Sequence, residues 1–173
     1  MGRSLNKSKY LLTPEVEHLE MILKKFMKTN ERDCLLLWFI LKTGSRAQEA
    51  LNVRKKDLDN IEKTVFIRGL KGSHDREIPL NTRFFDMLWR HAHSHKEDRV
   101  FPISYSRLVQ IWDFYRPCQK TIHALRHTFA IRLLQKTRDI RMVQYALGHT
   151  TLMSTTIYTE YLYTKSQLRK ALG

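Results

Sequence analysis

The stretch HALRHTFA, residues 123–130, opens a predicted helix of residues 123–135. His123 and Arg126 stand three positions apart in it, so a helix places both on one face. A packing or surface role would explain such a pair on its own, because either side chain could simply bond a neighbour. Whether the pair has a catalytic role depends on which other reactive side chains the sequence contains.

Three other places carry reactive residues in turn-forming surroundings. Arg46 follows the Thr-Gly end of a predicted helix, and Lys71 lies in the loop of a predicted hairpin. LGHTTLMSTTIYT, residues 147–159, contains a Gly-His turn with His149 and, nine positions later, Tyr158. Each feature alone has an ordinary structural explanation, such as a solvated lysine or a glycine that ends a helix. Their occurrence in one chain calls for a common explanation.

The pattern along the chain predicts an α+β domain that is mostly helical. Thr13-Pro14 is typical of a helix start, and apolar residues at helical spacing extend this helix to residue 28. CLLLWFIL lies in a predicted helix of residues 32–42 that is apolar all round, so that helix must be buried on every side. Further helices are predicted near Arg46 and for residues 83–93, 104–116, 138–147, 155–161 and 165–172.

TVFIR and REIPL, residues 64–68 and 76–80, predict two strands joined by the loop that contains Lys71. Gly72-Ser73 in this loop favours a turn, so the segment is predicted to be an antiparallel hairpin. The length of 173 residues suits one domain with a core of its own. We expect residues 1–12, rich in Lys, Ser and Asn, to form a linker or flexible arm, and residues 13–173 to form the domain.

The charge of the chain points to a polyanionic partner. Lysine and arginine total 31 against 17 acidic residues, which gives a net charge of +14. Such an excess favours nucleic acid. No stretch resembles a signal peptide, and the longest apolar run is too short to span a bilayer, so no membrane partner is expected. Cys34 and Cys118 have no paired spacing, which argues against a disulfide scaffold or a cysteine metal site.

The reactive residues together make a set suited to attack on a phosphodiester. Guanidinium groups match the non-bridging oxygens of the transition state with paired donors. Imidazoles donate to the same oxygens or move protons near neutral pH. A lysine can protonate a departing alkoxide, and a phenol can attack and form a stable ester. Fixed positive charge would supply most of the rate, so the set needs neither a metal nor a cofactor.

The order and spacing of these residues resemble the tyrosine recombinase and phage integrase family. TGSRAQEAL (residues 43–51) is similar to its first arginine box, and LKGSHDREIPL (70–80) to its lysine hairpin. HALRHTFA and LGHTTLMSTTIYT resemble its last two boxes, which are highly specific. The resemblance implies the catalytic fold of that family, with a small antiparallel sheet carrying the catalytic lysine hairpin.

The resemblance also implies a role for each matched residue. Arg46 and Arg126 would hold the non-bridging oxygens of the scissile phosphate, and Lys71 would be the general acid on the leaving oxygen. His123 would be the acid–base candidate, and His149 would donate a hydrogen bond in the transition state.

Tyr158 would be the nucleophile, because its spacing from the Gly-His turn matches the family better than that of Tyr161 or Tyr163. Glu49 is expected to hold the first arginine in place. His127 is expected to be a buried packing or supporting residue rather than a catalytic one.

The implied activity is site-specific DNA recombination, in which a strand is cleaved and rejoined through a covalent 3′-phosphotyrosyl intermediate. The implied partners are double-stranded DNA, further copies of the chain in a synaptic tetramer and accessory DNA-bending proteins. A cytoplasmic, nucleoid-associated protein is expected. Family members commonly carry an N-terminal core-binding domain, and none is expected within this chain.

Two departures and three alternatives remain. Ile122 stands where the family often has proline, and His74 where it often has a second basic hairpin residue. A type IB topoisomerase-like relaxing enzyme would share most of the set, and a catalytically silent DNA-binding regulator would retain the fold. A histidine-rich metalloprotein is a weaker alternative, since His91, His93 and His95 alternate in a segment that we expect to be polar and solvated.

Overall fold

The structure is a computed structural model that describes residues 6–70, 72–162 and 165–172. Lys71 and Tyr163, which the sequence analysis singled out, lie outside the described residues. Eight α-helices are present in the described part: α1 (Thr13–Phe26), α2 (Glu31–Thr43), α3 (Ala47–Asn52), α4 (Thr82–His93), α5 (Tyr105–Tyr115), α6 (His123–Thr137), α7 (Ile140–Leu147) and α8 (Lys165–Leu172).

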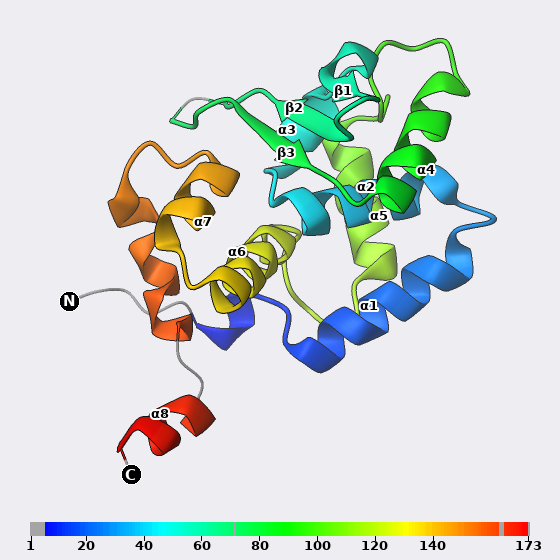
Figure 1. The fold of residues 1–173 in the computed structure, drawn as a ribbon. Helices are drawn as coiled ribbons and strands as arrows, with labels where there is room; N and C mark the ends of the chain where they lie inside the picture. The colour runs from blue at the N-terminus through cyan, green and yellow to red at the C-terminus, as the bar shows by residue number, and fades with distance from the viewer. Residues whose placement is uncertain (1–5, 71, 163–164, 173) are drawn as a thin grey trace.

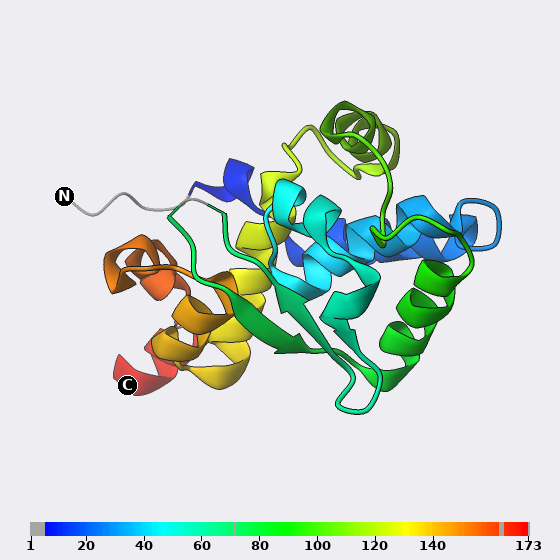
Figure 2. The ribbon, with the colours of Figure 1, turned by 90° about the horizontal axis from the view of Figure 1, so that it is seen from above.

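A three-stranded antiparallel sheet with the order β1-β2-β3 lies beside these helices (Figures 1 and 2). Its strands are β1 (Leu58–Asp59), β2 (Thr64–Ile67) and β3 (Arg76–Pro79). Val65 pairs with Leu58 on one side and with Ile78 on the other, and all three side chains are buried. The predicted hairpin is confirmed. β1 was not predicted, because two residues are too few to show an alternating pattern.

Helix α2 is the centre of the main core, and α1, α3, α4 and α6 pack around it (Figure 1). Its residues from Cys34 to Leu41 are buried, with the exception of the partly buried Trp38. The prediction of a helix buried on every side is therefore confirmed, since an apolar helix must find partners in every direction. The turn that ends this helix leads directly into α3 and so places Arg46 next to the core.

The segment predicted as a linker is in part a component of the domain. Tyr10 and Leu11 are buried. The backbone N–H of Leu11 donates to Thr128 Oγ1 at 2.8 Å, and Lys120 Nζ donates to the carbonyl of Tyr10 at 2.9 Å. The expectation of a flexible arm over residues 1–12 is therefore wrong for these two residues. The polar composition of the segment hid two apolar side chains, whose burial stabilises this part of it.

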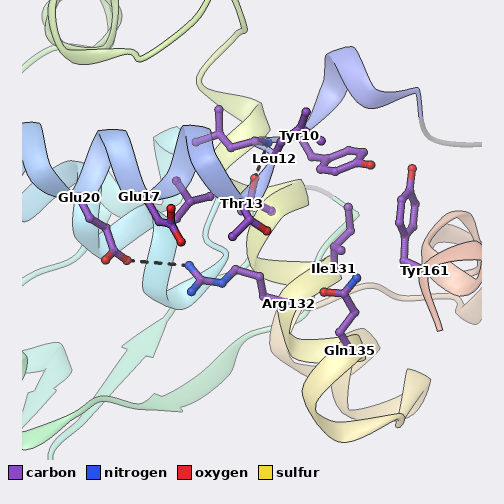
Figure 3. Close-up of a pocket in the computed structure, with 12 residues that line it drawn as sticks. Tyr10, Leu12, Thr13, Glu17, Glu20, Ile131, Arg132, Gln135 and Tyr161 are labelled. Carbon is purple, nitrogen blue, oxygen red and sulfur yellow. Dashed lines mark hydrogen bonds and ion pairs between the residues drawn. The ribbon is translucent and has the colours of Figure 1, made fainter. Parts of the chain in front are cut away.

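Tyr10 also forms one end of a cavity of about 330 Å³ between the start of α1 and helix α6 (Figure 3). Its ring meets that of Tyr161 edge-on, with 5.1 Å between the ring centroids. Glu20 and Arg132 face each other at the other end of this cavity, 3.9 Å apart. Among the described residues, none of those predicted to be catalytic lines it.

A second apolar cluster holds the segment around Tyr158 against α6 and α7. Tyr158 packs there with Ile131, Leu134, Val143 and Leu147. The helix predicted for residues 155–161 is present, and its residues Thr156–Tyr161 form a 3-10 helix, η4. Its hydrogen bonds join residues three apart, as from the N–H of Tyr158 to the carbonyl of Thr155 at 3.0 Å. β-Branched residues at its start disfavour an α-helix.

None of the described helices has the length and the hydropathy needed to cross a membrane.

Candidate active site

Arg46 stands at the N-terminus of α3, where Glu49 holds it in two ways. The Glu49 carboxylate accepts a hydrogen bond from the Arg46 backbone N–H at 2.8 Å and another from Arg46 Nη1 at 3.0 Å. Glu49 is 1% exposed, whereas the Arg46 side chain remains partly exposed. A buried carboxylate therefore orients a guanidinium whose outer side can meet a ligand. The expected pairing of these two residues is present.

Arg126, on helix α6, connects the turn after α2 and the end of α7 by donating hydrogen bonds to a backbone carbonyl in each. Its Nη1 donates to the Gly44 carbonyl at 2.6 Å, and its Nη2 donates to the Leu147 carbonyl at 2.8 Å. Burial and the neighbouring Arg46 lower the pKa of this guanidinium to about 10, and Glu49 opposes the shift. Arg126 therefore stays charged at neutral pH. It also fixes the turn after α2 against the end of α7.

A cavity of about 240 Å³ brings two arginines and a histidine together. Arg46, His123 and Arg126 line it, with Ser45 and Leu70 among its other walls. Burial lowers the pKa of His123, and the charges of Arg126 and Arg46 lower it further. This histidine is therefore neutral at neutral pH, beside two permanent cations. Such a concave, positively charged space suits a phosphate or another anion.

His149 lies in the turn after α7, and the hairpin loop docks on that turn. The His74 backbone N–H and the Ser73 hydroxyl both donate to the Gly148 carbonyl, at 2.8 and 2.9 Å. His149 Nδ1 lies 2.9 Å from Thr155 Oγ1. Burial lowers the pKa of His149 to about 4, and Arg126 and the other nearby arginines contribute to the shift. His149 is therefore neutral, with one ring nitrogen bound inside the protein.

The hairpin also approaches the arginine cavity, since Leu70 lines it. Lys71 follows Leu70 directly, but lies outside the described residues.

Tyr158 is buried, with 1% of its surface exposed, and its hydroxyl lies 2.8 Å from Nδ1 of His127. Burial raises the pKa of Tyr158 to about 12, against the opposing charges of Arg126 and Arg46. The influence of both arginines on this pKa places the phenol within their field. It is un-ionised at rest.

Two residues make contacts at the site that the sequence analysis did not predict. Arg76 is 2% exposed; its Nη2 donates to Glu49 Oε2 at 2.7 Å and its Nε donates to the Ala146 carbonyl at 2.8 Å. It links α3 to the end of α7, and it was not predicted. Its signal was an arginine at an inward position of a strand, two residues before the buried Ile78. The other residue is His127, which contacts the predicted nucleophile directly.

The histidines of α4 lie elsewhere. The expectation of a solvated segment is wrong for His91, which is 8% exposed and stacks on Phe101 at a centroid distance of 5.9 Å. Within the described ranges, no group of three histidine, cysteine or acidic side chains is placed to hold a metal ion.

The profile of the phage integrase family matches residues 9–165 of the chain. The chain belongs to the phage integrase family. Its relatives include the tyrosine recombinase XerA of Thermococcus onnurineus, 32% identical over 169 residues, with 90% of this chain and 59% of that protein covered. The tyrosine recombinase XerC of Oceanobacillus iheyensis is 33% identical over 162 residues, which cover 82% of this chain and 52% of that protein. The chain thus spans little more than half the length of these relatives.

Solved structures of the phage integrase family have the same fold. The XerH site-specific recombinase, in a pre-cleavage complex with its difH substrate, superposes with a TM-score of 0.75 at 29% identity, over 99% of this chain and 55% of that one. The catalytic domain of bacteriophage HP1 integrase superposes with a TM-score of 0.68 at 24% identity, over 94% and 92% of the two chains. The predicted family and fold class are confirmed.

Proposed function

We propose that this chain is the catalytic domain of a site-specific DNA recombinase that cleaves and rejoins strands through a 3′-phosphotyrosyl intermediate. The observation that carries the proposal is the arginine cavity, in which Arg46, His123 and Arg126 meet, with Tyr158 inside the field of both arginines. The relatives and the XerH structure support it, since they are named as recombinases and the XerH structure contains a substrate.

The proposed roles follow the chemistry of each side chain. Arg46 and Arg126 hold the two non-bridging oxygens of the phosphate and stabilise the charge that develops there. His149 donates a hydrogen bond to the same oxygens, and His123 bonds the phosphate from the wall of the cavity. Glu49 keeps Arg46 aimed at the ligand. These assignments are supported by the shared cavity and by the hydrogen bonds that fix both arginines.

The proposed reaction is an exchange of esters. The Tyr158 phenol gives up its proton to a basic group of the site as its oxygen attacks phosphorus. The bond to the 5′ oxygen breaks, and Lys71 supplies the proton that this oxygen needs. A 5′-hydroxyl from a second duplex then attacks the phosphotyrosine and restores the DNA backbone. The two guanidiniums supply fixed positive charge, so no metal enters the scheme.

The proposed partners are duplex DNA and further copies of the chain in a synaptic tetramer, with accessory DNA-bending proteins on the same DNA. The charge of +14 supports the first of these. Residues 13–173, with the buried Tyr10 and Leu11, form the proposed catalytic domain. An association with the nucleoid follows from a DNA substrate.

The test is to trap the covalent intermediate. A pool of duplexes, randomised on both sides of a nick, is incubated with the chain; cleavage near the nick releases a short fragment and leaves the protein attached to DNA. We expect an adduct that withstands denaturing gel electrophoresis, and we expect Tyr158→Phe to abolish it. Adduct formation by Tyr158→Phe would overturn the assignment of the nucleophile.

Two other results would favour the alternatives. Relaxation of supercoiled plasmid without sequence preference would indicate a topoisomerase-like enzyme. DNA binding without any adduct, under conditions in which the pool is bound, would indicate a silent regulator.

A further inference from the structure

The hydroxyl of Tyr158 and the ring of His127 form the contact from which this inference starts. Tyr158 OH lies 2.8 Å from His127 Nδ1, and the ring centroids are 5.8 Å apart with an interplanar angle of 55°. Tyr158 lies on η4 and His127 on α6, so tertiary packing brings them together. Tyr158 packs among apolar residues, including Ile131 and Leu134, and its contact with His127 is partly buried.

The direction of this hydrogen bond follows from the charge states of both groups. Burial, with smaller contributions from the neighbouring His123 and the charge of Arg126, lowers the pKa of His127 to about 4. The imidazole is therefore neutral, and the phenol, with its pKa of about 12, keeps its proton. Tyr158 consequently donates to Nδ1, and His127 carries its own proton on Nε2.

His123 and His127 are adjacent but contact different parts of the site. Their rings meet edge-on, with centroids 4.6 Å apart. His123 lines the arginine cavity, where the phosphate is proposed to bind, whereas His127 receives the hydrogen bond of the tyrosine. The family resemblance made His123 the acid–base candidate, but His127 is the histidine within hydrogen-bond distance of the attacking oxygen.

We propose that His127 receives the proton of Tyr158 when this residue attacks DNA, and returns it when the phosphotyrosine is resolved. This inference rests on the proposed function. In the forward step the O–H bond of Tyr158 breaks as Nδ1 takes the proton, and the new O–P bond forms as the bond from phosphorus to the 5′ oxygen breaks. That oxygen takes a separate proton from the general acid, so one proton is accepted and another is donated at opposite ends of the phosphate.

Bound DNA would prepare His127 for this role. The charged and titratable groups that influence it are Lys9 on η1 (Lys7–Lys9), His123 and Arg126 on α6, His149 in the turn after α7, and Tyr158 on η4. Burial, together with the positive charges of Lys9 and Arg126, holds the imidazole neutral. A phosphate between the arginines adds negative charge, which offsets their field and favours the protonated imidazole. The proton can therefore move when substrate is present, and the phenol is kept neutral when it is absent.

The test compares two substitutions in the full chain. His127→Asn places an amide oxygen near the position of Nδ1, so it can accept the hydrogen bond but cannot take the proton; His127→Ala removes both functions. The substrate is the nicked duplex recovered from the randomised pool, and the rate measured is single-turnover adduct formation at saturating protein. We expect both variants to react about 100-fold more slowly than the wild type, the lower end of the usual contribution of a general base.

The pH profile distinguishes proton transfer from mere positioning. The wild-type rate should rise with pH and then level off once His127 is unprotonated in the DNA complex. The rate of His127→Asn should continue to rise, because the phenol then depends on solvent to remove its proton. His93→Asn, at the exposed end of α4, is the matched control and should leave both the rate and the profile unchanged.

Several results would overturn the inference while leaving the proposed function in place. One is a wild-type rate and profile in His127→Asn with a loss only in His127→Ala, which would make the histidine a positioning residue. Another is faster adduct formation by His127→Ala, which would show that the contact with His127 restrains Tyr158 from attacking DNA. Circular dichroism and DNA binding check that the variants fold, with His127→Gln as the substitute if His127→Asn does not. Absence of an adduct in the wild type would instead overturn the proposed function.

Discussion

At the scale of single residues, the site depends on charges that are buried in pairs. Arg76 and Glu49 have no exposed side-chain surface and lie 2.7 Å apart. Burial raises the pKa of Glu49, but the hydrogen bond and charge of Arg76, the Arg46 N–H and the charge of Arg126 lower it overall. The carboxylate is therefore ionised beneath the candidate phosphate cavity. By accepting hydrogen bonds from both Arg46 and Arg76, this carboxylate fixes the two arginines relative to each other.

Replacing Arg76 with methionine should cost about 3–5 kcal/mol of unfolding free energy, because it leaves the Glu49 carboxylate buried with too little compensation. Urea unfolding measures this loss. The control is Asp86→Asn, which breaks an exposed pair with Lys63 and should cost less than about 1 kcal/mol. Equal losses in the two variants would contradict the importance of the buried pair.

The histidines of the site should make the fold sensitive to acid. The pKa values of His127 and His149 are lowered to about 4 from an ordinary value near 6.5. Between pH 4 and 6.5 the unfolded chain therefore binds more protons than the folded one. The free energy of unfolding is accordingly highest above pH 6.5 and decreases as the pH falls towards 4.

The predicted loss is about 1–3 kcal/mol for each of these histidines. It is measured as the free energy of unfolding in urea at a series of pH values. His149→Asn should flatten the dependence between pH 6.5 and 4, whereas His93→Asn should not. An unchanged slope in His149→Asn would contradict the buried, neutral state of this histidine.

At the scale of elements, the turn after α7 holds the hairpin against the site. Gly148 has a φ of 67°, a conformation that favours glycine, and a Cβ there would lie 2.6 Å from the His74 carbonyl oxygen. The same turn presents its own carbonyl to His74 and Ser73. One residue therefore sets both the direction of His149 and the docking of the loop that carries Lys71.

Gly148→Ala should destabilise the protein more than Gly72→Ala. Both glycines have positive φ values, 67° and 78°, so the backbone strain of about 1–2 kcal/mol is common to both variants. Only at Gly148 does the new methyl group meet a backbone atom; at Gly72 nothing lies within 4 Å. Urea unfolding should therefore show an additional loss of about 1–3 kcal/mol for Gly148→Ala, the usual cost of overpacking. Equal losses would contradict the tight contact between the turn and the hairpin.

At the scale of the whole molecule, positive charge extends beyond the candidate active site. A cavity of about 400 Å³ adjoins it through Leu70, which lines both. The other residues of this second cavity are mostly basic: Asn52, Arg54, Lys56, Arg68 and Arg99. Arg68 is held by Asp57, with its Nη2 2.6 Å from Asp57 Oδ1. We expect the basic side chains around this cavity to bind DNA phosphates next to the one that is proposed to react.

The double variant Lys56→Gln with Arg99→Gln should weaken binding to duplex DNA and reduce its salt dependence. Each lost phosphate contact lowers the slope of log affinity against log salt by about 0.9, so the expected change is about 1.8. Fluorescence anisotropy over a range of salt concentrations measures it. Lys24→Gln with Lys28→Gln on and after α1 removes the same charge from another exposed face and should change the slope less. An equal effect of the two double variants would indicate binding by net charge alone.

Much of the architecture was predictable from local patterns. Proline, glycine and apolar spacing report on the chain over one or two turns, and the helices and the two longer strands therefore lie within a few residues of their predicted bounds. The chemistry-bearing residue types were predictable as well, because their spacing within each box is a local property. β1 and the 3-10 form of η4 were not, since both are too short for a periodic signal.

The contacts that organise the site depend on tertiary packing. The bonds of Arg126 to Gly44 and Leu147, the burial of Arg76 against Glu49 and the placing of Tyr158 on His127 join residues that no local pattern relates. Local periodicity indicates which face of an element is buried, but not which distant side chain it meets there. The sequence alone therefore supplied the family, the elements and the reactive groups. The folded core decided which histidine meets the tyrosine.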